Sequence, residues 1–367
     1  MHQKSSRLLF FMCALFSAPV AYAENTDHFA DYPAVSGELI LELEGEASLG
    51  SDDPEDERDI SAFNAEISAE LGLSENFYID TTLVLEPVRD PDPGKDSFFE
   101  DEGAYVEELT LNFEYGPWSA FAGKFNPGFD TSWERDRGIW TEDFAEDYEI
   151  TEKIGLGGAY EMESDRFGNH IASASAFFAD TTFLSGSLGT SREHVSLEDG
   201  GLSNTESLSS YVVTLEGAEI PPIETIYYRL GYRHLEAAKE DEGDDDEGGV
   251  ILRLGNDFAI DVTEHFTADL LTEYTYVEDF EGTDDNNHYF TVSLVNTFYD
   301  RLNLAIGFTA RKVDSREEPT AHDHLLQVSG GYDFGTGLTA EIGWRNTEED
   351  GVHTDIAGGI VRYTYDF

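Results

Sequence analysis

Apolar and polar residues alternate along short stretches of this chain. In an early example, Leu39, Leu41 and Leu43 occupy every second position, and Glu42 and Glu44 occupy the positions next to them. Successive side chains of a β-strand point to opposite faces, so a period of two predicts a strand with one apolar and one acidic face. The same residues do not follow the longer period of a helix.

This alternation recurs about sixteen times. The predicted strands lie at 38–47, 63–71, 77–85, 109–115, a short stretch ending at 125, 154–162, about 170–179, 211–215, 226–232, 250–254, 266–276, 290–298, 302–308, 326–334, 338–344 and 361–367. An even number of short alternating segments is typical of a bacterial barrel that crosses a membrane with strands. The pattern therefore predicts an all-β fold, a transmembrane antiparallel β-barrel of about sixteen strands.

The apolar faces of these segments contain no Lys, Arg, Asp or Glu, although 27% of the chain is charged. A lipid-facing Arg or Lys at mid-depth of a membrane costs about 2 to 4 kcal/mol, so a face in contact with lipid must exclude charge. A sheet in a water-soluble protein tolerates charge at its rims. The exclusion therefore favours a lipid-facing outer wall.

The connections between the predicted strands alternate in length. Short ones lie at 72–76, 115–117, 299–301 and 335–337, and long acidic ones at 50–59, 87–103, 126–151, 182–207 and 236–248. Transmembrane barrels have short periplasmic turns and longer external loops. We therefore expect the long loops to share one end of the barrel. The loop 126–151 is the third of them.

The first 23 residues have the composition of a secretory signal. Basic Lys4 and Arg7 precede an apolar run at 8–16, and Ala21 and Ala23 fit a cleavage site after residue 23. We expect a signal peptide at 1–23, a short periplasmic segment at 24–35 and the barrel at 36–367. Cys13, the single cysteine, lies within the signal, so disulfides and thiol chemistry are excluded from the mature chain.

The chain is strongly acidic. It has 77 acidic and 21 basic residues and a net charge of −56, which argues against nucleic acid as a partner. An aromatic content of 13% is too high for an acidic disordered protein. A saline environment, a pore that attracts cations, and divalent ions held between loop carboxylates and lipopolysaccharide each account for the acidity, and the sequence does not separate them.

Three stretches resemble parts of known outer-membrane proteins. The last strand, with Tyr363, Tyr365 and Phe367, resembles the terminal strand of Gram-negative barrels, which the barrel-assembly machinery reads. The stretch 122–127 resembles the end of the strand that leads into the third loop of porins, including phosphate-selective porins. The stretch 152–160 resembles the strand that leaves that loop.

The resemblance to porins implies a third loop folded into the lumen and a homotrimer in the outer membrane, in contact with lipid and lipopolysaccharide. It implies no cofactor. Phosphate-selective porins are expected to have cationic lumens, whereas this chain has few lysines. Siderophore-uptake porins share a similar plan and remain an alternative.

The strand phases predict which charged residues line the lumen. The acidic ones are Glu42, Glu44, Glu66, Glu70, Glu108 and Glu114. The basic ones are Arg229, Arg233, Arg253, Arg311, Arg345 and Arg362. The third loop adds Glu134, Asp136, Glu142, Asp143, Glu146 and Asp147 as constriction residues.

If the third loop folds inward, its carboxylates could face the arginines across the narrowest part of the lumen. Such a transverse field would orient polar solutes and, because acids are in excess, favour cations. The alternative is that these charges pair along the wall. The predicted function is passive diffusion of small hydrophilic solutes and ions through a cation-preferring porin, with a substrate-specific uptake channel as the alternative.

Enzymatic motifs are absent from the sequence. It contains neither the G-x-S-x-G nucleophile elbow nor the H-E-x-x-H zinc signature. His322 and His324 flank Asp323 and could in principle bind a metal, but we assign no metal site and predict that the protein is not an enzyme. An outer-membrane hydrolase and a plugged barrel that acts as an adhesin or anchor remain further alternatives.

Overall fold

The structure is a computed structural model of the whole chain. It describes residues 32–129, 138–140, 143–192, 194–238, 245–259, 265–316 and 319–367. The predicted signal peptide at 1–23 lies outside the described residues. Within these ranges, no helix combines the length and the apolar character needed to cross a membrane.

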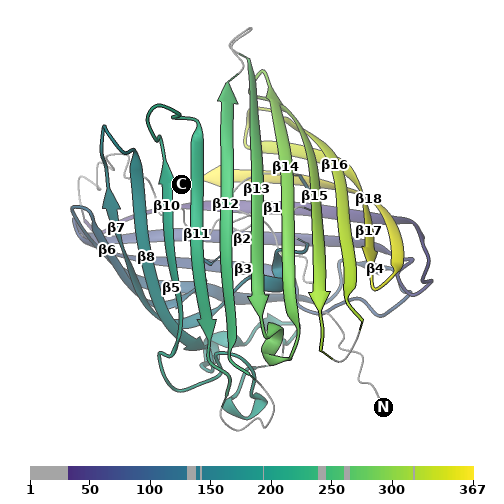
Figure 1. Cartoon of the computed structure of the whole chain (residues 1–367), viewed down its shortest axis with the longest axis horizontal. Coiled ribbons are helices and arrows are strands. Elements are labelled where there is room, and N and C mark those ends of the chain that lie inside the picture. The colour runs from purple at the N-terminus through teal and green to yellow at the C-terminus, as the bar shows by residue number, and fades with distance from the viewer. Residues whose placement is uncertain are drawn as a thin grey trace.

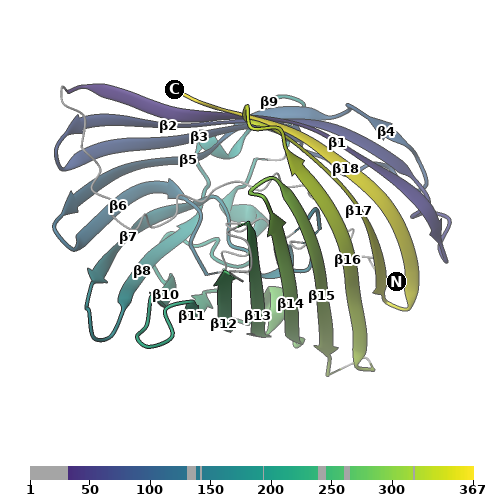
Figure 2. The same ribbon diagram turned by 90° about the horizontal axis from the view of Figure 1, so that it is seen from above.

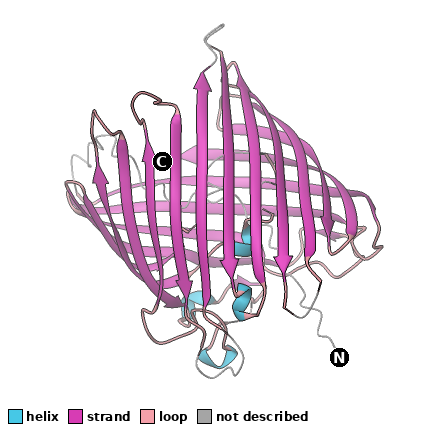
Figure 3. Cartoon of the chain, viewed as in Figure 1, coloured by secondary structure: helices cyan, strands magenta, loops and turns pink. Residues whose placement is uncertain are grey.

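The described residues form sixteen long antiparallel strands (Figures 1 and 3). The strands are β1 (Ala34–Ser51), β2 (Asp59–Ser74), β3 (Phe77–Pro87), β5 (Glu102–Tyr115), β6 (Trp118–Phe125), β7 (Lys153–Met162), β8 (Asn169–Ala179), β10 (Ser210–Ala218), β11 (Ile226–Leu235), β12 (Glu247–Ala259), β13 (Phe266–Glu278), β14 (Asn286–Phe298), β15 (Leu302–Asp314), β16 (Ala321–Asp333), β17 (Leu338–Glu349) and β18 (Val352–Asp366). Each predicted strand corresponds to one of them, so the predicted fold class is confirmed.

The sheet closes on itself. Strand β1 pairs with β2 on one side and with β18 on the other, with Leu39 opposite Tyr365 and Glu42 opposite Arg362. The remaining long strands pair with their neighbours in the chain, so no long strand has a free edge. Figure 2 shows the resulting ring from above. Two-residue strands β4 (Ser97–Phe98) and β9 (Leu188–Gly189) add short pairings to β2 and β5.

The long connections share one end of the barrel. Because neighbouring strands are antiparallel, alternate connections lie at the same end, and those at 52–58, 88–101, 126–152, 180–209 and 236–246 are all at one end. Three short 3-10 helices lie there, η3 (Phe183–Ser185), η4 (Leu197–Asp199) and η5 (Phe280–Gly282). At the other end, Tyr299 and Asp300 form a tight β14–β15 turn with φ values of 55° and 53°. The predicted alternation of loop lengths is therefore observed.

The two faces of the wall have opposite character. On β12, Leu252 and Leu254 are 51% and 53% exposed, whereas Arg253 between them is only 4% exposed. Apolar side chains thus face outward and charged side chains face inward, the reverse of a water-soluble sheet protein. A buried charged residue requires an ion pair or hydrogen bonds. The contacts of these inward-facing charged residues therefore determine how the interior is arranged.

One irregularity changes the inner face of β5. Thr82 of β3 lies opposite Glu108, but the next residue, Leu83, lies opposite Val106, so Glu107 is an extra residue in the ladder. Such a β-bulge shifts the phase of the strand. As a result, the neighbouring side chains of Glu107 and Glu108 both contact Asn126. The alternation pattern predicted only Glu108 on the inner face.

Candidate functional site

The inner wall divides into two charged regions. We call the inner-face carboxylates of β1, β2, β3 and β5 the acidic wall, and the six inner-face arginines of β11, β12, β15, β17 and β18 the arginine arc. The acidic wall consists of Glu38, Glu42, Glu44, Glu46, Glu66, Glu70, Asp80, Glu86, Glu107, Glu108 and Glu114. The arginine arc consists of Arg229, Arg233, Arg253, Arg311, Arg345 and Arg362.

Each arginine of the arc pairs with a carboxylate of another barrel strand. Four arginines pair with a carboxylate on a neighbouring strand. The N···O distances are 2.5 Å for Arg229 and Glu216, 2.6 Å for Arg233 and Glu247, 2.6 Å for Arg253 and Glu273, and 2.8 Å for Arg311 and Asp323. The other two arginines pair with β1, where Arg345 lies 3.6 Å from Glu46 and Arg362 contacts Glu42. Such charge-assisted contacts offset the cost of burying the guanidinium groups.

The described residues of the third loop lie against this arc. Asp147 contacts Arg311 at 2.8 Å, and Asp143 pairs with Arg345. The Tyr148 hydroxyl donates a hydrogen bond to Glu273 at 2.9 Å, and its carbonyl accepts one from Arg233. These partners belong to β11, β13, β15 and β17, far around the ring from β6 and β7. The 3-10 helix η2 (Glu146–Tyr148) is part of this segment, which is seen among the traces inside the ring in Figure 2.

Aromatic residues of the loop cover the arginines. The guanidinium carbons of Arg233, Arg311 and Arg345 lie 4.8, 4.5 and 5.5 Å from the ring centres of Phe129, Phe144 and Trp140, respectively. A cation over an aromatic face gains about 2 kcal/mol when both groups are desolvated. The sequence analysis named only the acidic residues of this loop as constriction residues. The aromatic residues of the loop were the feature of the sequence that indicated a buried segment.

Two glycines make room for the largest of these rings. A Cβ atom built on Gly343 would lie 2.9 Å from the Trp140 indole, and one on Gly358 would lie 2.6 Å from it. Trp140 is 2% exposed, and its backbone N–H donates to Gln327 of β16 at 3.0 Å. Its indole N–H donates to Glu46 of β1. The indole thus fits against the bare backbone of β17 and β18.

Asn126 fixes the start of the loop. Its backbone N–H donates to Glu108 at 2.9 Å, and its side-chain amide donates to Glu107 at 2.9 Å. Its side-chain oxygen accepts the backbone N–H of Glu152, at the far end of the loop, at 2.7 Å. The β5 bulge presents the two carboxylates side by side, and Asn126 links them to both ends of the loop.

The substitution Asn126→Ala should destabilise the protein by about 1–3 kcal/mol, because it leaves buried Glu107 without its donor. The unfolding midpoint in denaturant, followed by circular dichroism in detergent, measures this effect. Asn169→Ala is the matched control, since Asn169 makes a similar bond to Glu219 at 2.8 Å on the exposed surface. We expect the control substitution to change the free energy of unfolding by no more than about 0.5 kcal/mol. Equal effects of the two substitutions would contradict the role of Asn126.

The acidic wall carries polar atoms without protein partners. Glu66, Glu86 and Glu107 are at most 2% exposed, and in each of them one carboxylate oxygen lacks a hydrogen-bond partner. The other oxygens accept bonds from Ser68, Tyr105 and Asn126. None of the three makes an ion pair with a Lys or Arg of the described ranges. The acidic wall therefore presents buried carboxyl oxygens that neither the arginine arc nor any other described side chain satisfies.

The acids predicted to line the pore lie at inner-face positions. Glu42 and Glu66 are buried, and Glu44, Glu70, Glu108 and Glu114 are partly exposed. All six predicted arginines lie on the inner face as well. Among the predicted constriction residues, Asp143 and Asp147 contact arginines directly and Glu146 begins η2, whereas Glu134, Asp136 and Glu142 lie outside the described residues. Asp143 and Asp147 therefore do not face the arginines across a gap.

The predicted assembly signal lies on the last strand. Tyr363, Tyr365 and Phe367 are 40%, 53% and 49% exposed. The backbone of Phe367 exchanges two hydrogen bonds of 2.9 Å with Gly37 of β1. The recognition of these aromatic residues by an assembly machinery stays a prediction.

Acids of the long connections also carry charge near neutral pH. A hydrogen bond from Lys95 lowers the pKa of Asp92 below its usual value. The backbone N–H of Ser196, at 2.6 Å, and its hydroxyl, at 2.9 Å, lower the pKa of Asp199 in the same way. Both carboxylates are therefore ionised at neutral pH.

Comparison with known proteins gives matches in structure alone. No family model and no curated protein matches the sequence. Among solved structures, OprB of Pseudomonas putida is 12% identical, with a TM-score of 0.61 over 90% of this chain and 94% of OprB. The outer membrane channel DcaP of Acinetobacter baumannii is 11% identical, with a TM-score of 0.55 over 90% of this chain and 96% of DcaP. OmpT of Vibrio cholerae in its trimer form is 12% identical, with a TM-score of 0.51 over 91% of this chain and 100% of OmpT.

The chain therefore has the fold of the sixteen-stranded outer-membrane porins. The sequence identities of 11–12% extend the likeness to the fold and no further.

Proposed function

We propose that this protein is a porin-type channel through which small hydrophilic solutes and ions diffuse passively across the outer membrane. The observation that supports it best is the inverted wall, with exposed leucines outside and buried charges inside. An apolar outer band and a polar interior are the properties of water-filled transmembrane barrels. The structural likeness to DcaP, which is described as an outer membrane channel, agrees with this proposal.

The channel is proposed to prefer cations. Carboxylates of β10, β12, β13, β16 and the third loop pair with most of the arginine arc, whereas few residues of the acidic wall have a basic partner. A lumen lined by unbalanced charge of one sign concentrates the opposite ion. Cations are therefore expected to pass along β1, β2, β3 and β5. The third loop, held against the arc by its aromatic and acidic residues, narrows the opposite side.

Location and assembly are parts of the same proposal. Export through a cleaved signal at 1–23 and insertion into the outer membrane, with the barrel-assembly machinery reading Tyr363, Tyr365 and Phe367, follow from the sequence. Contacts with lipid and lipopolysaccharide follow from the apolar outer face. A homotrimer is supported by the likeness to the trimer form of Vibrio cholerae OmpT.

Single-channel recording of the refolded mature protein in a planar bilayer tests the proposal. We expect stable conductance steps, in groups of three for a trimer, and a reversal potential of cation-selective sign under a salt gradient. A reversal potential of the opposite sign would refute the cation preference alone. A correctly folded barrel without conductance would refute the channel and favour the plugged barrel.

A substrate-specific uptake channel is the second candidate. It is favoured by the unpartnered amide of Asn64, which is 0% exposed, faces the same interior and lies opposite Glu42. Such a buried polar group can recognise a ligand by hydrogen bonds. Conductance that saturates with one solute would support this candidate. The hydrolase alternative has weaker support, because all histidines of the described strands lie at outer-face positions.

A further inference from the structure

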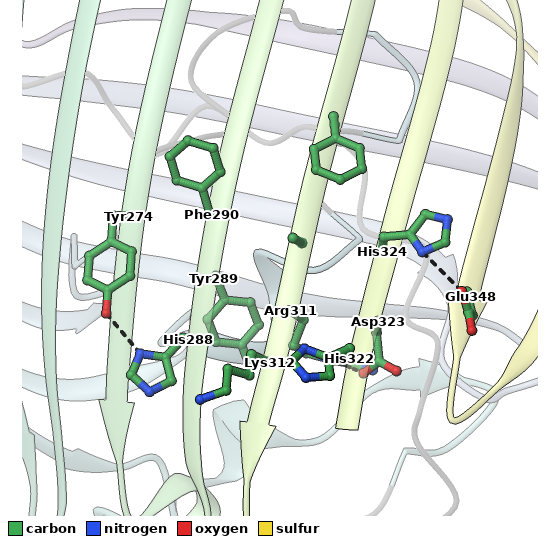
Figure 4. A pocket seen from close by; sticks show the side chains of 12 residues that line it. Tyr274, His288, Tyr289, Phe290, Arg311, Lys312, His322, Asp323, His324 and Glu348 are labelled. Carbon is green, nitrogen blue, oxygen red and sulfur yellow. Dashed lines mark hydrogen bonds and ion pairs between the residues drawn. The ribbon is translucent and has the colours of Figure 1, made fainter. Parts of the chain in front are cut away.

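Four of the outward-facing histidines lie on β14, β16 and β18 near the long-loop end. They are His288, His322, His324 and His353. The sequence showed His322 and His324 flanking Asp323, but the strand separates these side chains. Asp323 faces inward and pairs with Arg311 at 2.8 Å, whereas both histidines face outward. Figure 4 shows His322 and His324 on this face. The sequence neighbours therefore do not form one metal site.

His324 has other partners across the sheet. The strand register places it directly opposite Glu348 of β17, and Glu348 lies directly opposite His353 of β18. His324 Nδ1 lies 3.4 Å from Glu348 Oε2, a contact drawn in Figure 4, and His353 Nε2 lies 3.9 Å from the same oxygen. Two imidazoles thus approach one carboxylate oxygen from both sides, on three hydrogen-bonded strands.

Two of the three ligand-to-ligand distances in this triad are close to those of a zinc centre. Zinc binds imidazole nitrogen and carboxylate oxygen at about 2.0–2.2 Å, so the ligand atoms of a tetrahedral site lie about 3.4 Å apart. The two observed distances of 3.4 and 3.9 Å require only small side-chain adjustments. The rings of His324 and His353 have centroids 6.4 Å apart, so both imidazoles must rotate toward Glu348 before all three ligand atoms reach one ion.

We propose that His324, Glu348 and His353 bind one divalent transition-metal ion of the zinc class, with water at the remaining position. Two imidazoles and one carboxylate suit zinc, whereas calcium and magnesium require oxygen ligands. The three side chains are 32%, 32% and 51% exposed, so the ion can enter from solvent or the membrane surface. This site is independent of the channel proposal.

The neighbourhood supports an open site at the rim of the barrel. A groove of 640 Å³ on this part of the wall is lined by residues that include Phe290, Phe308, Lys312, His322, His324 and Glu348 (Figure 4), and His353 lies beside it across β17. The Phe308 ring lies 6.3 Å from that of His324, with 29° between their planes, and restricts the imidazole. Lys312 pairs with Asp314 rather than with Glu348. The positive charge of Lys312 is thus directed to another carboxylate.

Metal binding to the refolded full chain, without a histidine tag, tests the proposal. Zinc is titrated against a chromophoric chelator, and cobalt is used as a spectroscopic probe. We expect one zinc ion per chain with intense visible cobalt bands typical of a tetrahedral site. The variant H324A/H353A should lose the bands and weaken zinc binding by at least about tenfold. E348Q should also weaken it, with a smaller change of side-chain volume.

His288→Ala is the matched control. His288 also faces a carboxylate, Asp314, at 3.4 Å, and the Tyr274 hydroxyl lies 2.8 Å from its other ring nitrogen, so the carboxylate pairing is similar. H288A should retain the cobalt bands and the zinc affinity. Wild-type binding no tighter than that of H324A/H353A, or equal losses in H288A, would overturn the site. Circular dichroism verifies that each variant is folded.

Discussion

Replacing Arg311 with methionine is expected to destabilise the barrel by about 3–5 kcal/mol and to release the third loop from the wall. Arg311 is 2% exposed and pairs with Asp323, which is equally buried, as well as with Asp147 and Glu349. Removal of Arg311 leaves the buried carboxylate of Asp323 without its ion-pair partner, which costs several times more than the loss of a surface pair. The Phe144 ring would also lose the cation that it covers.

The unfolding midpoint in denaturant measures the first effect, and single-channel conductance measures the second. A loop detached from the arc should increase the conductance and its noise. Arg316→Met is the control, because Arg316 pairs with Asp284 on the exposed surface, where an ion pair contributes at most about 1 kcal/mol. If the R311M variant were as stable as the R316M variant and its conductance were unchanged, Arg311 and its ion-pair partners would not be what holds the third loop against the wall.

Neutralising Glu70, Glu108 and Glu114 together is expected to reduce the cation-to-anion permeability ratio by about tenfold. These acids belong to β2 and β5 and are partly exposed to the interior, so a passing ion can approach them. A unit charge about 5 Å from a passing monovalent cation in water contributes about 0.8 kcal/mol, roughly a fourfold change in local concentration. Three such charges, partly screened by salt, account for the larger combined effect.

Reversal potentials of the E70Q/E108Q/E114Q variant under a salt gradient provide the measurement. The control is D53N/E55Q/E57Q, which removes the same charge from the connection between β1 and β2. If selectivity follows the acidic wall, the control should change the ratio less than about twofold at 0.15 M salt, because exposed charges beyond about 8 Å are screened. Equal changes would assign the selectivity to the overall charge of the protein.

The strands could be predicted from the sequence because a lipid-facing wall imposes a strict local rule. Each outward position must be apolar, as with Leu252 and Leu254, and the intervening Arg253 must face inward. The rule depends only on neighbouring residues, so it identified all sixteen strands and the inner-face positions of the six predicted acids and the six predicted arginines. The β5 bulge was missed because nothing in the local pattern distinguishes Glu107 from Glu108.

The arrangement of the interior could not be predicted in the same way. Asp143 and Arg345 are 202 residues apart, and Trp140 and Gln327 are 187 apart, so their contacts depend on the closed barrel and not on any local period. The charges of the loop were visible in the sequence, but their partners were not. The small side chains at Gly343 and Gly358 acquire meaning only once Trp140 lies against them.

The pairing of the first strand with the last determines the order in which the molecule can be built. Glu42 and Arg362 meet across this seam although they are 320 residues apart. The ring cannot close until the final strand has been exported, and until then β1 presents an unpaired edge open to other chains. Pairing of two strands so far apart in the sequence is slow, because the chain between them must lose conformational entropy before the contacts between β1 and β18 form. A chain that lacks only β18 would therefore be an open sheet with two exposed edges, and not a slightly narrower pore.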